Sequence, residues 1–388
     1  MKLRAWWFHR QGLDGSLRNA TPAQVLERVG WARSVGGVGP YLTLFARART
    51  TRDAADAAVA KLQLHELPSA RGCTYVLPAS DFALGLKVGE EAAAAPMKVA
   101  AKLGVTEKEI AKLERAVLDA LDGGEALDPD AIRDATGKAS RSLGEVGKKK
   151  GVTTTLPLAL GRLQARGEMR RVPVNGRLDQ QRYKYVRWNL SPFSGAAYTE
   201  LARRFFGWVG PATLGEFQWF SALGVKAAKE AVAPLDLVAA EGVAERLLLP
   251  ADAKAWSAFE APEQPCYSLV SSLDSIAAAR REIGSLLDPK DAKRSVFTEA
   301  SDKAGSALAD LPSHAILDRG RVVGLWEFDI ETSTIAWGTF GVKKTKALEA
   351  AVEETQAFVR DQLGDARSFS LDSPKSRVGR VETVRKLK

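Results

Sequence analysis

The chain has 388 residues, 45% hydrophobic and 27% charged, a composition typical of a globular protein with roughly two to four domains. It has no run of 18 apolar residues, and its start lacks the apolar core of a signal peptide, so we expect a cytoplasmic protein with no membrane partner. Its two cysteines and three histidines lack metal-ligand or disulfide spacing, and it has no phosphate-binding glycine loop, so we expect no metal, no other cofactor and no NTPase activity.

The first expected unit, residues 1–89, combines helices with a hairpin. Apolar spacing predicts helices at 4–10, 22–33 and 52–62, followed by a strand at 73–77. A helical linker is expected over 90–127. His65 near the hairpin is a candidate general base, although a lone histidine is more often structural.

The second unit, residues 128–190, holds the basic character of the chain. Segment 141–188 has 12 Lys or Arg against 3 Asp or Glu, so its net charge of +9 equals that of all 388 residues. A local basic block on a folded pattern indicates a polyanionic partner, most often nucleic acid. The alternative is a solvated basic face without a partner. The candidate phosphate-binding residues are Lys148, Lys149, Lys150, Arg162, Arg166, Arg170, Arg171, Arg177 and Arg182.

The same unit predicts a helix followed by a hairpin. Apolar residues repeat at helical spacing within 153–166, and alternating runs at 169–174 and 182–188 flank Asn175-Gly176. Asn-Gly between two strand-like runs is a strong hairpin signal. This order is typical of a winged helix, whose helix enters a DNA groove while its wing contacts phosphates.

The third unit, residues 191–260, has helical patterns over 196–234 and short strands at 237–240 and 246–249. Its aromatic residues could stack on bases, but their helical spacing favours core packing. They are Phe205, Phe206, Trp208, Phe217, Trp219 and Phe220.

Residues 261–388 read as a small β-rich domain followed by a helix at 344–363. Strands are expected at 267–273, 314–317, 322–328 and 334–340. The tail from Lys375 has six basic residues and one acidic residue. It either extends a phosphate-contacting surface or is a frayed end.

Five short motifs occur in order along the chain: RQGL at 10–13, RGCTY at 71–75, GPAT at 210–213, SLD at 272–274 and RGRVVGLW at 319–326. At these separations they resemble the tandem winged-helix DNA glycosylases of the AlkZ/YcaQ type, which repair alkylated bases and interstrand crosslinks. The resemblance covers residues 3–340. It implies a double-stranded DNA partner and three winged helices around a concave DNA channel. The expected fold is therefore mainly α with β-hairpin wings (α+β), with three tandem winged-helix units and a small C-terminal β-barrel-like domain.

The resemblance stops at the catalytic motif. The family carries Gln-x-Gln or Gln-x-Asp, which positions a water and stabilises positive charge on the sugar. Counting back from Arg47, this motif falls on Arg33, Ser34 and Val35, and residues 30–39 contain no Gln, Asp or Glu. Arg33 stays protonated and cannot act as a base, and Val35 has no polar atom.

The catalytic residues are therefore unknown, and the enzymatic activity stays open. Besides His65, the weak candidates are Asp274 and Gln11. Asp274 either binds a water or caps the following helix, and we favour the cap. Gln11 belongs to the opening motif of the resemblance and not to its catalytic motif.

Three functions compete at this point. The first is a monomeric, nucleoid-associated protein that binds alkylated or otherwise damaged DNA on a glycosylase-like scaffold. The second is an active alkylpurine DNA glycosylase whose water-positioning site has moved. The third is a winged-helix transcriptional regulator, which we rank last because regulators usually bind as dimers and the sequence has no heptad seam.

Overall fold

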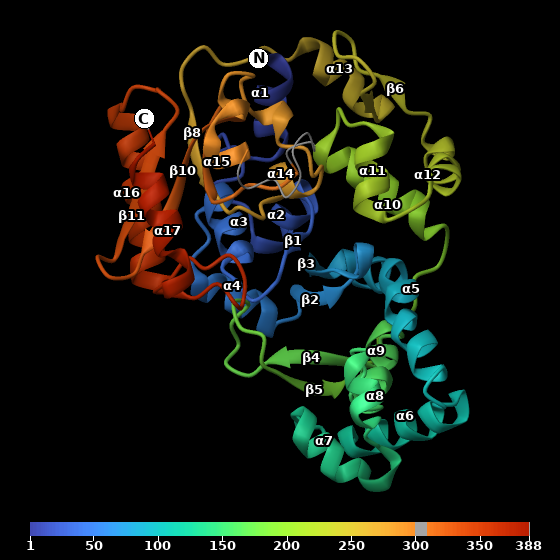
Figure 1. Ribbon diagram of the computed structural model, residues 1–388. Helices are drawn as coiled ribbons and strands as arrows, with labels where there is room; N and C mark the ends of the chain where they lie inside the picture. The colour runs from blue at the N-terminus through green and yellow to red at the C-terminus, as the bar shows by residue number, and fades with distance from the viewer. Residues whose placement is uncertain (299–308, 388) are drawn as a thin grey trace.

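The computed structural model describes residues 1–298 and 309–387 and shows a mainly helical α+β fold (Figure 1). Four small antiparallel sheets accompany the helices in these ranges. The expectation of a mainly α fold with β-hairpins is confirmed. No helix within these ranges is both long and apolar enough to cross a membrane.

The first unit consists of helices and a three-stranded sheet of order β1-β3-β2. Its elements are α1 (Lys2–Arg10), α2 (Pro22–Val29), β1 (Ala32–Arg33), α3 (Gly39–Ala48), α4 (Arg52–Ala60), β2 (Leu64–Pro68) and β3 (Thr74–Pro78). The helix expected over 22–33 is wrong at its end. It stops at Val29 because Gly30 has φ 99°, and β1 then pairs with β3. Neither α3 nor β2 follows from the sequence pattern.

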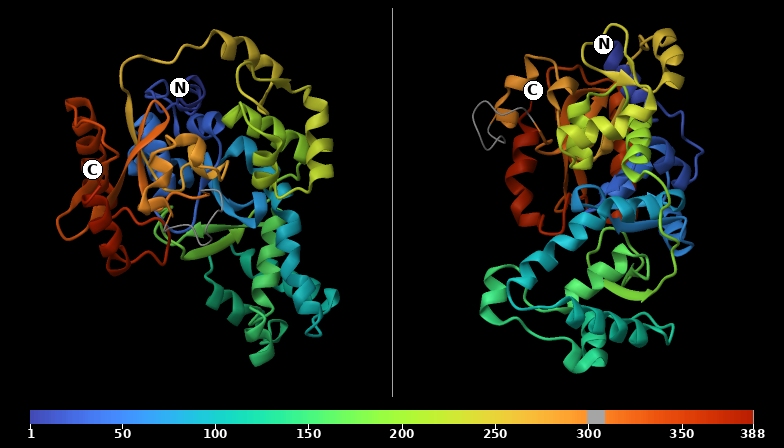
Figure 2. Two further views of the ribbon diagram at one scale, coloured as in Figure 1. Left: turned by 45° about the horizontal axis from the view of Figure 1, so that its top comes forward. Right: turned by 90° about the vertical axis from the view of Figure 1, so that its right-hand side faces the viewer.

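The second unit forms a lobe that projects from the rest of the molecule (Figure 1 and Figure 2). Its elements are α5 (Phe82–Ala101) and α6 (Glu107–Leu121), which lead into it, then α7 (Pro129–Thr136), α8 (Gly144–Lys149), α9 (Leu156–Ala165), β4 (Met169–Pro173) and β5 (Tyr183–Arg187). Helix α5 crosses residue 89, where the first unit is expected to end. The expected hairpin is confirmed, since β4 and β5 pair from Met169 with Arg187 to Pro173 with Tyr183.

The third unit again places helices before a two-stranded sheet. Its elements are α10 (Ala197–Val209), α11 (Leu214–Ser221), α12 (Val225–Val232), β6 (Val238–Ala239), β7 (Leu247–Leu248) and α13 (Pro250–Ala258). Five of the six aromatic residues named above are buried, as the helical spacing predicts. The exception is Trp219, which lines a pocket.

The C-terminal region contains an open sheet of order β11-β10-β9-β8. Its elements are β8 (Tyr267–Val270), α14 (Ser275–Ala278), α15 (Ser295–Thr298), β9 (His314–Asp318), β10 (Arg321–Asp329), β11 (Thr334–Thr339), α16 (Lys346–Phe358) and α17 (Pro374–Arg385). The expected β-barrel is wrong: the described residues form no closed barrel. Four strands are too few to close when small barrels use about five or more, and helices α16 and α17 pack against the sheet instead.

The basic tail is not a frayed end, because it forms α17 and packs on the sheet. Arg377 is buried and lies 2.7 Å from Asp365, and Arg380 lies 2.9 Å from the buried Glu327. With Arg385, which lies 2.6 Å from Asp329, three basic residues of the tail are used in ion pairs within the fold.

The first unit is held between its neighbours by two hydrophobic cores. Leu26 belongs to a core that includes Trp326 of β10, and Trp31 belongs to one that includes Phe205 of α10. The lobe has a separate core around Leu163. The first unit thus packs against both the C-terminal unit and the third unit.

Candidate functional site

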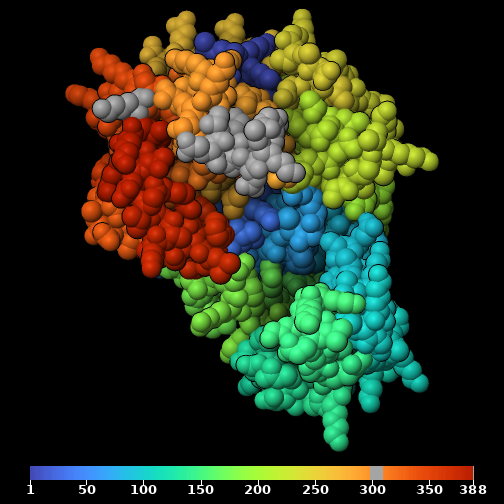
Figure 3. Space-filling view, viewed as in Figure 1, coloured from blue at the N-terminus to red at the C-terminus, as the bar shows by residue number. Residues whose placement is uncertain are grey.

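The three consecutive lysines of the lobe are exposed. Lys148 and Lys149 end α8 and Lys150 follows it. Lys148 has Glu145 at 3.9 Å, and no ion pair of Lys149 or Lys150 occurs among the described residues. In Figure 3 the surface is hollowed between this lobe and the body, with first-unit residues set back behind the rim. These lysines are therefore free to contact a polyanion.

Arg162 and Arg166 share one face of α9, as their spacing predicts, and this face packs on α6. Arg162 lies 2.8 Å from Glu114 and 2.5 Å from Glu107. Arg166 lies 3.2 Å from Glu114 and 2.5 Å from Glu168. Their role as phosphate contacts stays a prediction, and these ion pairs already partly neutralise both guanidinium groups.

Arg170 and Arg171 lie on β4, close to the first unit. Arg170 is half-buried, and burial lowers its pKa. Arg171 lies over the ring of Tyr183 at 4.4 Å and has its Nη2 atom 3.4 Å from the carboxylate of Glu66. Arg171 is therefore paired with a buried acid, the carboxylate of Glu66.

The tip of the β4–β5 hairpin is docked against the body of the protein. The backbone N–H of the buried Leu178 donates to the Tyr41 hydroxyl at 2.9 Å. Arg177 pairs with Asp179, whose carbonyl accepts a hydrogen bond from Arg367 at 2.6 Å. Arg182, further along the loop, is exposed. The hairpin thus bridges the lobe to the first and C-terminal units.

The residues at which we expect the family's catalytic motif, Arg33 to Val35, lie at the end of β1. Ser34 is buried, and its hydroxyl donates a hydrogen bond to the carboxylate of Glu66 on β2. Val35 offers its carbonyl to the backbone of Ser370 at 3.0 Å. The guanidinium of Arg33 lies over Tyr75 at 5.3 Å, and its Nη1 atom is buried without a hydrogen-bond partner.

His65 is 1% exposed and lies beside the rings of Phe82 and Trp188. Burial, with smaller contributions from the charges of Arg170 and Arg171, lowers its pKa to about 3. The imidazole is therefore neutral at pH 7 and enclosed by aromatic rings. This environment is typical of a structural histidine more than of a general base.

Gln11 and Asp274 belong to one buried network around Arg47. Asp274 accepts two hydrogen bonds from Arg47, at 2.7 and 2.8 Å, and caps α14 by accepting from the backbone of Ile276. Gln11 accepts from Arg47 at 3.0 Å and donates to two backbone carbonyls. The cap interpretation of Asp274 is confirmed.

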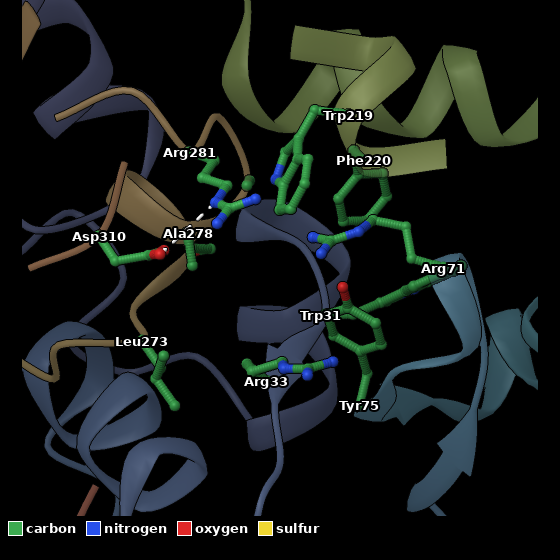
Figure 4. A pocket seen from close by; sticks show the side chains of 12 residues that line it. Trp31, Arg33, Arg71, Tyr75, Trp219, Phe220, Leu273, Ala278, Arg281 and Asp310 are labelled. Carbon is green, nitrogen blue, oxygen red and sulfur yellow. Dashed lines mark ion pairs between the residues drawn. The ribbon is translucent and has the colours of Figure 1, made fainter. Parts of the chain in front are cut away.

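A pocket of about 210 Å³ lies beside Arg33 (Figure 4). Trp31, Tyr75 and Phe220 are buried and form its floor. Its other polar lining includes Arg71, Arg281 and Asp310, with Arg281 and Asp310 3.5 Å apart. Arg71, Trp219 and Arg281 come from three separate units. The sequence did not identify Arg71, Arg281 or Glu66 as candidate site residues.

Among the described residues, no group of three or more His, Cys, Asp or Glu is placed to hold a metal ion.

Comparison of the chain with known protein families and solved structures agrees with this architecture. Residues 37–359 match the family described as DNA glycosylase AlkZ-like. The chain therefore belongs to the AlkZ-like DNA glycosylase family, as its motifs predict. The solved structure of the Streptomyces sahachiroi DNA glycosylase AlkZ is similar, with a TM-score of 0.68 and 20% identity over 95% of this chain and 97% of that chain. At this identity the likeness establishes the shared fold. No curated protein gives a significant match.

Proposed function

We propose that the protein binds double-stranded DNA as a monomer and takes part in the recognition or repair of alkylated or otherwise damaged DNA. The observation that carries the proposal is the exposed Lys148–Lys150 cluster on a scaffold of the AlkZ-like DNA glycosylase family. Lysine and arginine side chains that neutralise phosphates supply most of the sequence-independent affinity for DNA. The three helix-and-hairpin units would act as winged helices around the duplex.

The remaining basic residues would have different roles. Arg182 is exposed and can contact a phosphate directly. Arg170 and Arg171 would contact DNA where the hairpin meets the first unit. Arg162, Arg166 and Arg177 would contribute through the field of their ion-paired groups, because each already has a carboxylate within 3.2 Å.

The electrostatics of the pocket argue against the usual chemistry of the family on a cationic base. Arg33, Arg71 and Arg281 line the pocket, and Arg33 is one of the residues at which we expect the catalytic motif. An N7-alkylated purine is itself positive, so these charges would repel it and would oppose positive charge on the sugar. We therefore propose DNA binding without release of alkylpurines.

One observation favours an active glycosylase as a second candidate. Glu66 is a buried carboxylate bonded to Ser34, and its Oε2 atom has no hydrogen-bond partner although Arg171 lies 3.4 Å away. A carboxylate at this place could position a water and stabilise a cationic sugar.

One experiment distinguishes DNA binding without base release from an active glycosylase. The protein is incubated with N7-methylated duplex DNA and with the unmodified duplex, and binding is followed by mobility shift and base loss by alkali-labile strand breaks. We expect a shift with both duplexes and no breaks above the protein-free control. Breaks on the methylated duplex would establish the second candidate, and the absence of any shift would refute DNA binding.

A further inference from the structure

The strongest unassigned feature is the arrangement of arginines around Trp219 (Figure 4). The guanidinium carbon of Arg71 lies 3.3 Å from the centre of the Trp219 ring, and that of Arg281 lies 4.1 Å from it. The indole of Trp219 is therefore contacted by two guanidinium groups that come from different units of the chain.

This arrangement leaves the arginine N–H groups available to a ligand. A guanidinium stacked on an aromatic ring uses its face for the ring and keeps its donors, which lie in its plane, for an anion. Within the described part of the chain neither Arg33 nor Arg71 has an ion pair, and Arg281 has only Asp310 at 3.5 Å. The Arg33 Nη1 and Trp219 Nε1 atoms are buried without a hydrogen-bond partner. Two buried donors of residues that line the pocket thus lack an acceptor.

The backbone around the pocket is strained at the two stacked arginines. Arg71 has φ 61° and Arg281 has φ 51°, and both values lie in the left-handed region that side chains other than glycine rarely occupy. Such conformations are costly, and they cluster at ligand-binding positions. Burial, together with the charges of Arg33 and Arg281, lowers the pKa of Arg71, so the pocket gathers like charges.

Size and charge limit the ligand. The pocket measures about 210 Å³, below the roughly 300–1,000 Å³ of sites that enclose a drug-sized molecule, so it suits a compact group better than a whole nucleotide. Its described lining carries three arginines and one aspartate, a net charge of +2. A phosphate monoester has a charge of about −1.5 to −2 at pH 7, whereas a phosphodiester within a strand has only one negative charge.

We propose that this pocket binds a phosphate monoester, held by Arg33, Arg71 and Arg281. The chemistry fits a terminal phosphate at a DNA strand break or a free phosphate group in solution. The first source rests on the proposed DNA binding; the second does not. If the ligand is a terminal phosphate at a strand break, the protein recognises broken strand ends in addition to the duplex. A phosphate monoester occurs in DNA only where a strand ends.

The test uses the full-length protein and nicked duplexes that differ only at the nick, which carries a 5′-phosphate, a 3′-phosphate or hydroxyls on both sides. Affinity is measured by fluorescence anisotropy. We expect at least one phosphorylated nick to bind about tenfold more tightly than the hydroxyl nick, as charge-assisted hydrogen bonds warrant. Inorganic phosphate should reduce this difference. In Arg71→Gln and Arg281→Gln the preference should disappear, while Arg360→Gln, an exposed arginine of the C-terminal region, should retain it.

The outcomes separate the two sources and the two proposals. A preference for a phosphorylated nick supports recognition of strand ends. Equal affinity for all nicks, with calorimetric binding of inorganic phosphate to the wild type and not to Arg281→Gln, supports the free-phosphate source. Equal affinity without phosphate binding overturns the pocket proposal and leaves DNA binding intact. Failure to bind any duplex refutes the proposed function, and phosphate calorimetry still tests the pocket.

Discussion

Ser34 donates a hydrogen bond to the buried carboxylate of Glu66, at the position where the sequence motifs lead us to expect the family's catalytic residues. The acid comes from β2 and not from the motif segment itself. Because Arg171 of β4 lies 3.4 Å from the same carboxylate, the pair also joins the first unit to the lobe. Ser34 thus lies beside the Arg171–Glu66 ion pair, which joins two units of the chain.

Glu66→Gln separates a structural role from a catalytic one. The substitution keeps the shape and removes the charge, which leaves Arg171 without its partner in a largely buried place. We expect unfolding in urea to show a loss of about 1–3 kcal/mol, and alkylated DNA to show no base loss with either protein. If the wild type released bases and Glu66→Gln did not, Glu66 would be catalytic.

Replacing Lys148, Lys149 and Lys150 with Gln should weaken DNA binding mainly by removing counterion release. We expect the plot of log affinity against log salt to become shallower by about 3, since each phosphate contact contributes about 0.9. Fluorescence anisotropy at several salt concentrations measures the slope. The charge-matched control is Lys343, Lys344 and Lys346→Gln, three exposed lysines at the start of α16. Equal slopes for the two triple variants would rule out the proposed contact.

Asp274→Asn should destabilise the protein strongly. Both Asp274 and Arg47 have fully buried side chains, and removal of one charge leaves the other unpaired. Asparagine still caps a helix, so the loss reports the ion pair more than the cap. We expect about 3–5 kcal/mol from urea unfolding. The control Asp53→Asn, with a side chain 83% exposed, should change little; a similar loss in both would contradict this account.

His65 should make the protein sensitive to acid. Its pKa falls to about 3 in the folded state because burial disfavours the charged form, while a histidine in the unfolded chain titrates near its ordinary pKa of 6.5. Its contribution to stability is therefore fully present above pH 6.5 and is lost as the pH falls towards 3. Replacement by Gln should reduce the slope of unfolding free energy between pH 6 and 4 by about 1.4 kcal/mol per pH unit. His9→Gln, at a partly exposed position beside Asp14, is the control, and an unchanged slope in His65→Gln would show that the buried imidazole does not govern it.

Local signals in the sequence predict individual elements well and their assembly poorly. Asn175-Gly176 predicts the β4–β5 hairpin because the turn chemistry is contained in neighbouring residues. Strand patterns near the C-terminus predict the strands but not whether their sheet closes, which depends on strand number and on α16 and α17. The motif comparison located Arg33, yet it could not place Glu66 beside Ser34, since their contact depends on the pairing of β1, β3 and β2.

The pocket beside Arg33 is a second case in which the sequence does not predict how distant elements assemble. Arg71, Trp219 and Arg281 belong to three units far apart in the sequence, and no spacing rule brings them together. The helical spacing of Trp219 with its aromatic neighbours favoured the core, because Phe217 and Phe220 are indeed buried there. A helix such as α11 presents more than one face, and Trp219 lies on the face towards the pocket.

Leu178→Ala tests whether the hairpin tip holds the lobe against the body. Leu178 is 1% exposed, and it packs with residues of the first and C-terminal units. Its truncation should cost about 2–5 kcal/mol, and because the tip can open without unfolding the rest, the loss should appear as local opening. We expect the amides of 174–182 to exchange hydrogen at least tenfold faster, and trypsin to cleave more rapidly after Arg177 or Arg182. Val174→Ala, at a position 55% exposed in the same loop, should exchange like the wild type. Unchanged exchange in Leu178→Ala would show that the lobe is held by the Arg171–Glu66 pair and the packing of α5 on α9, and not by the tip.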